Sequence, residues 1–158
     1  MKLKLEDWSS LGSLALSVMF VALLLSFYTF LIGPQGSGPQ QVVEPGSLLL
    51  QLIFISVAPS LVLAGVAFVL SKTYGSAVGG GALIASGLIL IVGMAIGVTM
   101  IPRIQAQYIV GGAGAAPYIF MPAGVGVVAV GGYMLAISQT RTRSRRAHVT
   151  SRDMDDLR

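Results

Sequence analysis

The chain has 158 residues, of which 54% are hydrophobic and only 10% are charged, and it contains no cysteine. A soluble domain carries about 25% charged residues, so this chain has too few to cover a water-facing surface. Nine of its sixteen charged residues lie after Thr140, which leaves the first 140 residues almost uncharged. Disorder is excluded as well, because it requires low hydrophobicity. The composition therefore predicts an integral membrane protein.

Four long stretches of the chain contain no charged residue. About 20 residues of α-helix, each rising about 1.5 Å, cross the roughly 30 Å hydrocarbon core. The stretches lack the alternation of a membrane β-strand. We therefore expect an all-α integral membrane fold with four transmembrane helices in an up-down bundle, over residues 11–32, 48–70, 77–101 and 118–138. These spans form one membrane domain, residues 1–140, and a basic-then-acidic tail follows, residues 141–158.

Prolines indicate where the predicted helices end. Five of the seven lie at or outside the predicted helix ends, where a missing N–H costs little: Pro34, Pro39, Pro45, Pro102 and Pro117. Pro59 and Pro122 fall inside predicted spans. We expect Pro59 to kink the second span, with Ser56 partly satisfying the carbonyls that the proline frees.

The distribution of basic residues predicts the orientation of the chain. The first apolar stretch is longer than the 7–15-residue core of a signal peptide, so we expect it to be retained as the first span. Basic residues favour the cytoplasmic side. One side of the predicted membrane holds Lys2, Lys4, Lys72 and six tail arginines, and the other holds only Arg103. Both termini are therefore expected to be cytoplasmic, in the plasma membrane of a prokaryote.

The first span carries small residues at heptad-like spacing. Small residues let helix backbones approach closely inside a membrane. The predicted seam consists of Gly12, Ala15, Met19, Ala22, Ser26, Thr29 and Gly33. Phe20, Leu24 and Phe27 fall outside it. The spacing predicts left-handed helix packing along this seam.

The other spans carry comparable small-residue faces. These are Ser60, Ala64, Ala67 and Ser71 in the second span, Gly75, Gly79, Ala82, Ser86, Gly93 and Gly97 in the third, and Gly126, Ala129 and Ala136 with Tyr133 in the fourth. The faces either meet one another inside a bundle, or one of them docks a partner subunit. The residues selected as candidate packing or partner contacts are Gly12, Ala15, Ala22, Ser26, Gly79, Ser86, Gly93, Gly97 and Gly126.

The residues needed for most active-site chemistry are missing from the spans. The single histidine, His148, lies in the tail, and no predicted span contains a carboxylate. Metal sites and covalent or acid–base catalysis depend on His, Cys, Asp, Glu or Lys. We therefore expect no metal site, no cofactor and no intrinsic enzyme activity. A path for an uncharged solute stays open as an alternative, lined by Ser56, Ser60, Ser86, Thr99 and Tyr133.

Charged and aromatic residues flank the spans. Four arginines follow the fourth span closely, and we expect them to orient it and to bind anionic lipid headgroups: Arg141, Arg143, Arg145 and Arg146. No aromatic residue lies among them, so nucleic acid is not an expected partner. Arg103 is expected either to reach the headgroups or to pair with a carboxylate of a partner protein. Trp8 is expected to anchor the first span at the membrane interface.

These patterns favour a supporting role in a membrane. The leading hypothesis is a non-catalytic accessory subunit of a larger membrane complex, such as a respiratory oxidase or a metal-dependent membrane monooxygenase. Its partners would be membrane lipids and other integral membrane subunits. The alternatives are an independent homo-oligomeric carrier or channel for an uncharged solute, and a regulatory tetraspan protein that interacts with lipids.

Overall fold

The computed structural model describes residues 5–36, 38–39, 44–74, 77–109 and 111–155, and beyond residue 140 it describes the backbone alone. Over these residues every regular element is helical. The long helices are α1 (Leu5–Ile32), α3 (Ala58–Tyr74), α4 (Ala77–Met100) and α5 (Gly111–Asp155). A shorter helix, α2 (Pro45–Leu52), leads into α3 through the π-helical turn η2 (Ile53–Val57). Short 3-10 turns lie in the connections: η1 (Pro34–Gly36), η3 (Ile101–Arg103) and η4 (Ala106–Tyr108).

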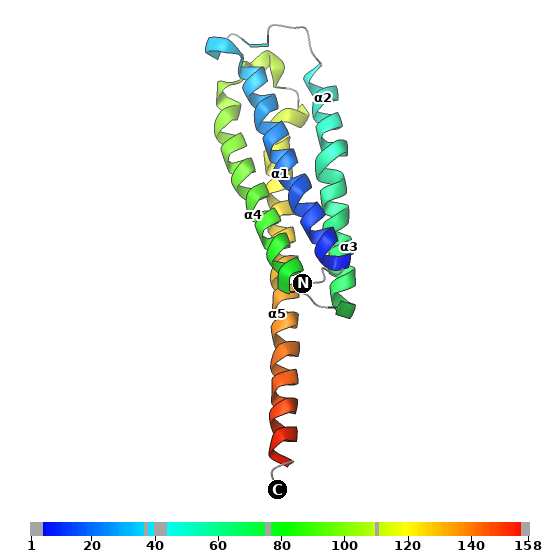
Figure 1. Cartoon of the computed structure of the whole chain (residues 1–158). Helices are drawn as coiled ribbons and strands as arrows, with labels where there is room; N and C mark the ends of the chain where they lie inside the picture. Colours follow the sequence, from blue (N-terminus) through cyan, green and yellow to red (C-terminus); the bar gives the residue numbers. More distant parts are fainter. Residues whose placement is uncertain (1–4, 37, 40–43, 75–76, 110, 156–158) are drawn as a thin grey trace.

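Four helical segments are long and apolar enough to cross a membrane: Asp7–Ile32, Pro45–Ser71, Ala77–Arg103 and Gly112–Thr140. The predicted all-α fold with four candidate membrane spans is thereby confirmed. Figure 1 shows α1, α3, α4 and α5 gathered side by side, with α5 running on beyond the end of the others. The predicted third span agrees with α4 to within one residue, and the other three helices are longer than predicted.

The fourth helix differs most from its prediction, at both ends. It begins at Gly111, so Pro117 lies inside the helix and not at its end as predicted. It also continues without a break through residues 141–155, which the sequence analysis set apart as a tail. After Gly132 the chain contains neither glycine nor proline. The backbone therefore meets no helix-breaking residue beyond the span.

The irregularity expected at Pro59 takes the form of a π-helical turn. In η2 the Ala58 N–H donates to the Ile53 carbonyl, five residues back. Such a wide turn accommodates a residue that does not fit the α-helical ladder. The Ser56 hydroxyl donates to the Leu52 carbonyl. The hydroxyl therefore bonds to a carbonyl of the π-helical turn. It does not bond to the Ile55 carbonyl, which Pro59 leaves without an α-helical N–H donor.

The two long connections meet at one end of the bundle. Gly33 ends α1 in a left-handed conformation with φ 66°, and a Cβ there would lie 2.0 Å from the Gly38 carbonyl oxygen. Gly38 then lies against Tyr108 of η4, and the side-chain amide of Gln105, just before η4, donates to the Gly36 carbonyl oxygen at 2.9 Å. Nearby Ile104 is buried in the same apolar cluster as Leu49. These contacts hold the ends of α1 and α4 and the starts of α2 and α5 together.

Paired glycines bring α4 and α5 into backbone contact. A Cβ at Gly87 would lie 2.6 Å from the Gly124 carbonyl oxygen, and one at Gly124 would lie 3.0 Å from the Gly87 carbonyl oxygen. The same reciprocal contact recurs seven residues along, where Gly131 faces Gly80 at 2.8 Å. Seven residues are about two helical turns, so both contacts fall on one seam between antiparallel helices.

The glycine contacts predict a clear difference between two alanine substitutions in this interface. Gly87→Ala places a methyl group against backbone atoms, so we expect the free energy of unfolding to fall by about 1–3 kcal/mol. Gly132→Ala lies on the same interface helix, but a Cβ there meets nothing within 4 Å. Its unfolding free energy should stay within about 0.5 kcal/mol of the parent. Detergent unfolding in mixed micelles measures both variants, and equal stabilities would contradict the α4–α5 packing.

Candidate functional site

The most polar part of the buried core is a cluster of four serines, Ser13, Ser17, Ser60 and Ser86, here called the serine cluster. Ser13 and Ser17 come from α1, Ser60 from α3 and Ser86 from α4, and all four are at most 1% exposed. The Ser17 Oγ lies 2.8 Å from the Ser60 Oγ and 2.7 Å from the Ser86 Oγ. Ser17 therefore joins three helices in the middle of the bundle.

Every hydroxyl in the serine cluster has a partner. Ser60 donates to the Ser13 carbonyl oxygen at 2.9 Å, which uses its only hydrogen. With Ser86 donating to Ser17 and Ser17 donating to Ser60, each of these three hydroxyls donates one hydrogen bond. The Ser13 Oγ lies 3.3 Å from the Ser60 Oγ and completes the set. The arrangement is a closed set of interhelical hydrogen bonds, of the kind that holds helices together in a membrane.

Polar residues occupy the buried face of α1 over only part of its length. Asp7 and Ser10 are also buried, and the Ser10 hydroxyl donates to the Asp7 carbonyl oxygen at 2.9 Å. From Asp7 to Ser17 the helix rises about 15 Å, half of the hydrocarbon thickness. Beyond Ser17 the same face carries the fully buried Phe20 and Leu24. In the described bundle, the polar seam thus ends against tightly packed apolar side chains.

A second buried polar contact lies in the apolar half and involves Pro117. Because proline has no N–H, the carbonyl of Ala113, four residues earlier, has no helical donor. The Tyr28 hydroxyl donates to this Ala113 oxygen at 2.8 Å. Gly97 makes room for the tyrosine, because a Cβ there would lie 3.1 Å from the Tyr28 ring. This contact explains how α5 begins before Pro117 without leaving a buried carbonyl unsatisfied.

The predicted small-residue seam of the first span faces away from the bundle. Ala15, Ala22 and Ser26 are exposed, whereas Gly12 lies against α3, with Leu63 3.0 Å from a Cβ built there. The buried face carries the residues that the prediction excluded, Phe20, Leu24 and Phe27. Ala15, Ala22 and Ser26 therefore do not pack inside the described bundle. The exposed face and the buried face of α1 both have heptad spacing. The buried face also carries small residues, the serines Ser13 and Ser17.

The candidates in the third and fourth spans divide in the same way. Gly79, Ser86, Gly93 and Gly97 are buried in α4, as expected for packing residues. In contrast, Gly126 is exposed, and a Cβ there meets nothing within 4 Å. It therefore does not pack inside the described bundle. The selected candidates did not include the contacting glycines, which are Gly80, Gly87, Gly124 and Gly131, and their seven-residue spacing in each helix is the signal that connects them.

The small-residue face of the second span does pack inward. Ser60, Ala64, Ala67 and Ser71 are all buried. Ala64 and Ala67 belong to an apolar cluster with Leu83, Val127 and Met134. In the bundle, α3 thus packs through the face that the spacing predicted.

The residues named for a solute path do not meet. Ser56 and Thr99 donate to carbonyls of their own helices, and Thr99 is exposed. Tyr133 is 51% exposed and lies beside Phe68, with ring centroids 5.9 Å apart. Only Ser60 and Ser86 belong to the serine cluster. These side chains therefore do not line a common path in the described structure.

The flanking residues lie at the surface where the structure describes them. Trp8 is 63% exposed beside the start of α1, and Arg103 is exposed at the end of α4. The side chains of Arg141, Arg143, Arg145 and Arg146 lie outside the described part. Among the described residues, no three His, Cys, Asp or Glu side chains gather as a metal site would require.

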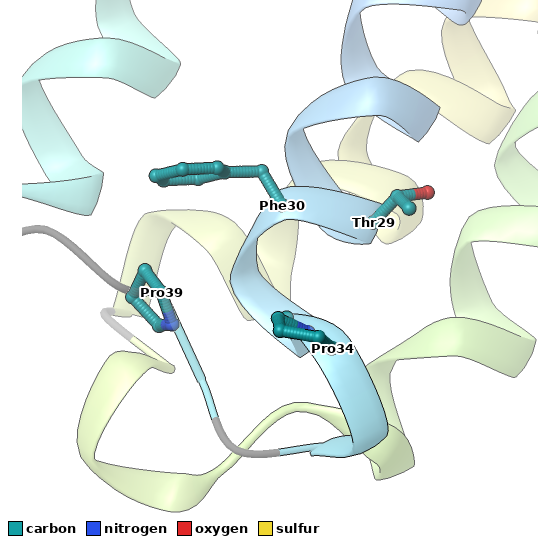
Figure 2. Close-up of a pocket in the computed structure, with 5 residues that line it drawn as sticks. Thr29, Phe30, Pro34 and Pro39 are labelled. Carbon is teal, nitrogen blue, oxygen red and sulfur yellow. The ribbon is translucent and has the colours of Figure 1, made fainter.

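A shallow hollow of about 390 Å³ lies where α1 ends, lined by Thr29, Phe30, Gly33, Pro34 and Pro39. Figure 2 shows the Phe30 ring and Pro39 on one side, with the Thr29 hydroxyl turned away from them. That hydroxyl donates to the Leu25 carbonyl oxygen at 2.8 Å. The other described side chains that line the hollow are apolar.

Comparisons of the chain with protein-family models, with curated proteins and with solved structures find no match. The residues themselves therefore carry the functional argument.

The serine cluster predicts unequal effects for two serine substitutions on α1. Ser17→Ala removes the hydroxyl between Ser60 and Ser86, and we expect the unfolding free energy to fall by about 1 kcal/mol, the scale of an interhelical hydrogen bond in a membrane protein. Ser26→Ala, on the exposed face, should change it by less than about 0.5 kcal/mol. Unfolding in mixed micelles compares the two, and a larger loss for Ser26→Ala would refute the assignment of the buried face.

The Tyr28 contact predicts coupling with Pro117. Tyr28→Phe leaves the Ala113 carbonyl without its donor, so it should lower the unfolding free energy by about 1–3 kcal/mol. In a Pro117→Ala background the new N–H at residue 117 reaches the same carbonyl, and the cost of Tyr28→Phe should fall to well under half. A double-mutant cycle measures this coupling. Additive effects would show that the hydroxyl does not serve the carbonyl that Pro117 frees.

Proposed function

We propose that the chain is a non-catalytic subunit that supports a larger membrane complex, such as a respiratory oxidase or a metal-dependent membrane monooxygenase. The observation that carries the proposal is the exposed small-residue face of α1, represented by Ala15, Ala22 and Ser26. In a membrane, small residues favour association because they let another helix approach closely. This helix already buries its opposite face in its own bundle, so the exposed face is free for a partner helix.

The packed interior supports this proposal over an independent carrier or channel. The hydroxyls of the serine cluster bond to one another, and Phe20 and Leu24 fill the core beyond them with no exposed surface. A solute path needs polar groups that line a continuous opening. The described core is filled by packed side chains, which supports a bundle without a solute path.

We propose further that the four spans run up and down through the plasma membrane of a prokaryote, with both termini in the cytoplasm. The two connections that meet through Gln105 and Gly36 would then lie outside. Glu44 and Arg103 are exposed there, whereas the other basic residues belong to the two terminal segments and to the last turn of α3. Basic residues in short loops favour the cytoplasmic side.

The test is purification of the tagged chain from its native membrane in mild detergent, with a matched pair of variants. The parent should co-purify with stoichiometric integral membrane subunits, some of which carry haem, copper or iron. Ala22→Phe blocks the exposed face of α1 and should reduce this recovery at least tenfold. Val62→Phe makes a comparable change on α3, where Val62 is 65% exposed, and should leave recovery unchanged.

Two results would contradict the proposal. One is a chain that purifies alone as a homo-oligomer and carries solute flux in liposomes. The other is a partner whose recovery is the same for the parent and Ala22→Phe. Because both substituted positions face outward, the variants should retain the unfolding free energy of the parent to within about 0.5 kcal/mol, which the unfolding assay checks first.

A further inference from the structure

The helix α5 leaves the bundle as an isolated helix. Gly131 in α5 faces Gly80 in α4, so Ala77, the first residue of α4, lies near the level of Met134. Residues from 141 onward therefore project about 10 Å or more past the start of α4, at about 1.5 Å per residue. Figure 1 shows this part of α5 standing clear of the other helices. At this level no other described helix lies beside α5.

Four arginine positions lie in the first part of the projecting helix, at 141, 143, 145 and 146. Successive positions in an α-helix are about 100° apart. Positions 141 and 145 therefore fall within about 40° of each other, and positions 143 and 146 within about 60°. The two pairs lie on roughly opposite sides of the helix. Because residues 111–155 form one continuous helix, this register is fixed by the backbone.

The segment carries its positive charge just beyond a layer of lipid headgroups. Arg141 lies about 10 Å past the level of Ala77, where the third candidate span begins, and each headgroup layer is about 5–8 Å thick. The segment follows Thr140, where the fourth candidate span ends. All four positions thus lie within about one Debye length of the layer, where anionic phospholipids attract arginine. No acidic residue lies between Thr140 and Arg152 to neutralise them.

We propose that Arg141, Arg143, Arg145 and Arg146 form a collar that binds anionic phospholipid headgroups around α5. A protein partner docked on one side of the helix would need basic positions on one face. The collar instead places charge on two opposite sides, which suits lipids that surround an isolated helix. The collar binds lipids around α5, and this binding does not depend on the partner subunit proposed for α1.

The test uses the full-length protein in a neutral detergent, with phosphatidylglycerol and phosphatidylcholine added as competing lipids and bound lipid counted by native mass spectrometry. The parent should prefer phosphatidylglycerol, and the preference should weaken as salt rises. Arg141→Gln with Arg145→Gln removes one side of the collar, and Arg143→Gln with Arg146→Gln removes the other. Each pair should weaken phosphatidylglycerol binding about thirty-fold, the factor that two arginines near an anionic surface contribute.

A charge-matched control separates the collar from net charge. Arg152→Gln with Arg158→Gln removes two positive charges from the same tail and should leave the preference within about twofold of the parent, since neither residue belongs to the collar. An effect from only one of the collar pairs would overturn the proposal in favour of one-sided docking. Equal binding of the two lipids, or co-purified nucleic acid in place of phosphatidylglycerol, would overturn it as well.

Discussion

Inside the hydrocarbon core, each polar group of the chain must find its partner within the protein, because lipid supplies neither donors nor acceptors. This constraint accounts for two buried polar contacts between helices. The serines of α1, α3 and α4 bond to one another around Ser17, and the Tyr28 hydroxyl serves the carbonyl that Pro117 leaves without an N–H. Both contacts join different helices, so satisfying the polar groups also fixes which helices are neighbours.

The bundle also depends on the close approach of helix backbones. Apolar side chains gain little by leaving lipid for another helix, so packing depends on how closely the helices fit. The glycine pairs Gly80 with Gly131 and Gly87 with Gly124 bring α4 and α5 together over two levels. With that interface and the serine cluster formed, the small residues on the outer face of α1 remain unused by the bundle. That surplus is the physical basis for proposing a partner subunit.

The sequence predicted the spans well and the helix faces only partly. Charge-free length marks a span whatever its neighbours are, so α4 was placed to within one residue. The buried face of α1 was harder to predict than its length, because Ser13 and Ser17 form a second face of small residues at heptad spacing. In lipid, hydrophobicity does not distinguish the two faces. The extension of α5 before Pro117 was missed because its compensation, the Tyr28 hydroxyl, is 85 residues away in the chain.

The facing of α1 is the central claim, and site-directed spin labelling tests it most directly. The chain contains no cysteine, so single cysteines introduced along residues 13–29 can each carry a label without background. Accessibility to oxygen, which concentrates in lipid, then reports the lipid-facing positions. The account predicts maxima at residues 15, 18, 22, 26 and 29, and minima at 13, 17, 20, 24 and 28. The opposite phase, with labels at 17, 20 and 24 more accessible than those at 15, 22 and 26, would contradict it.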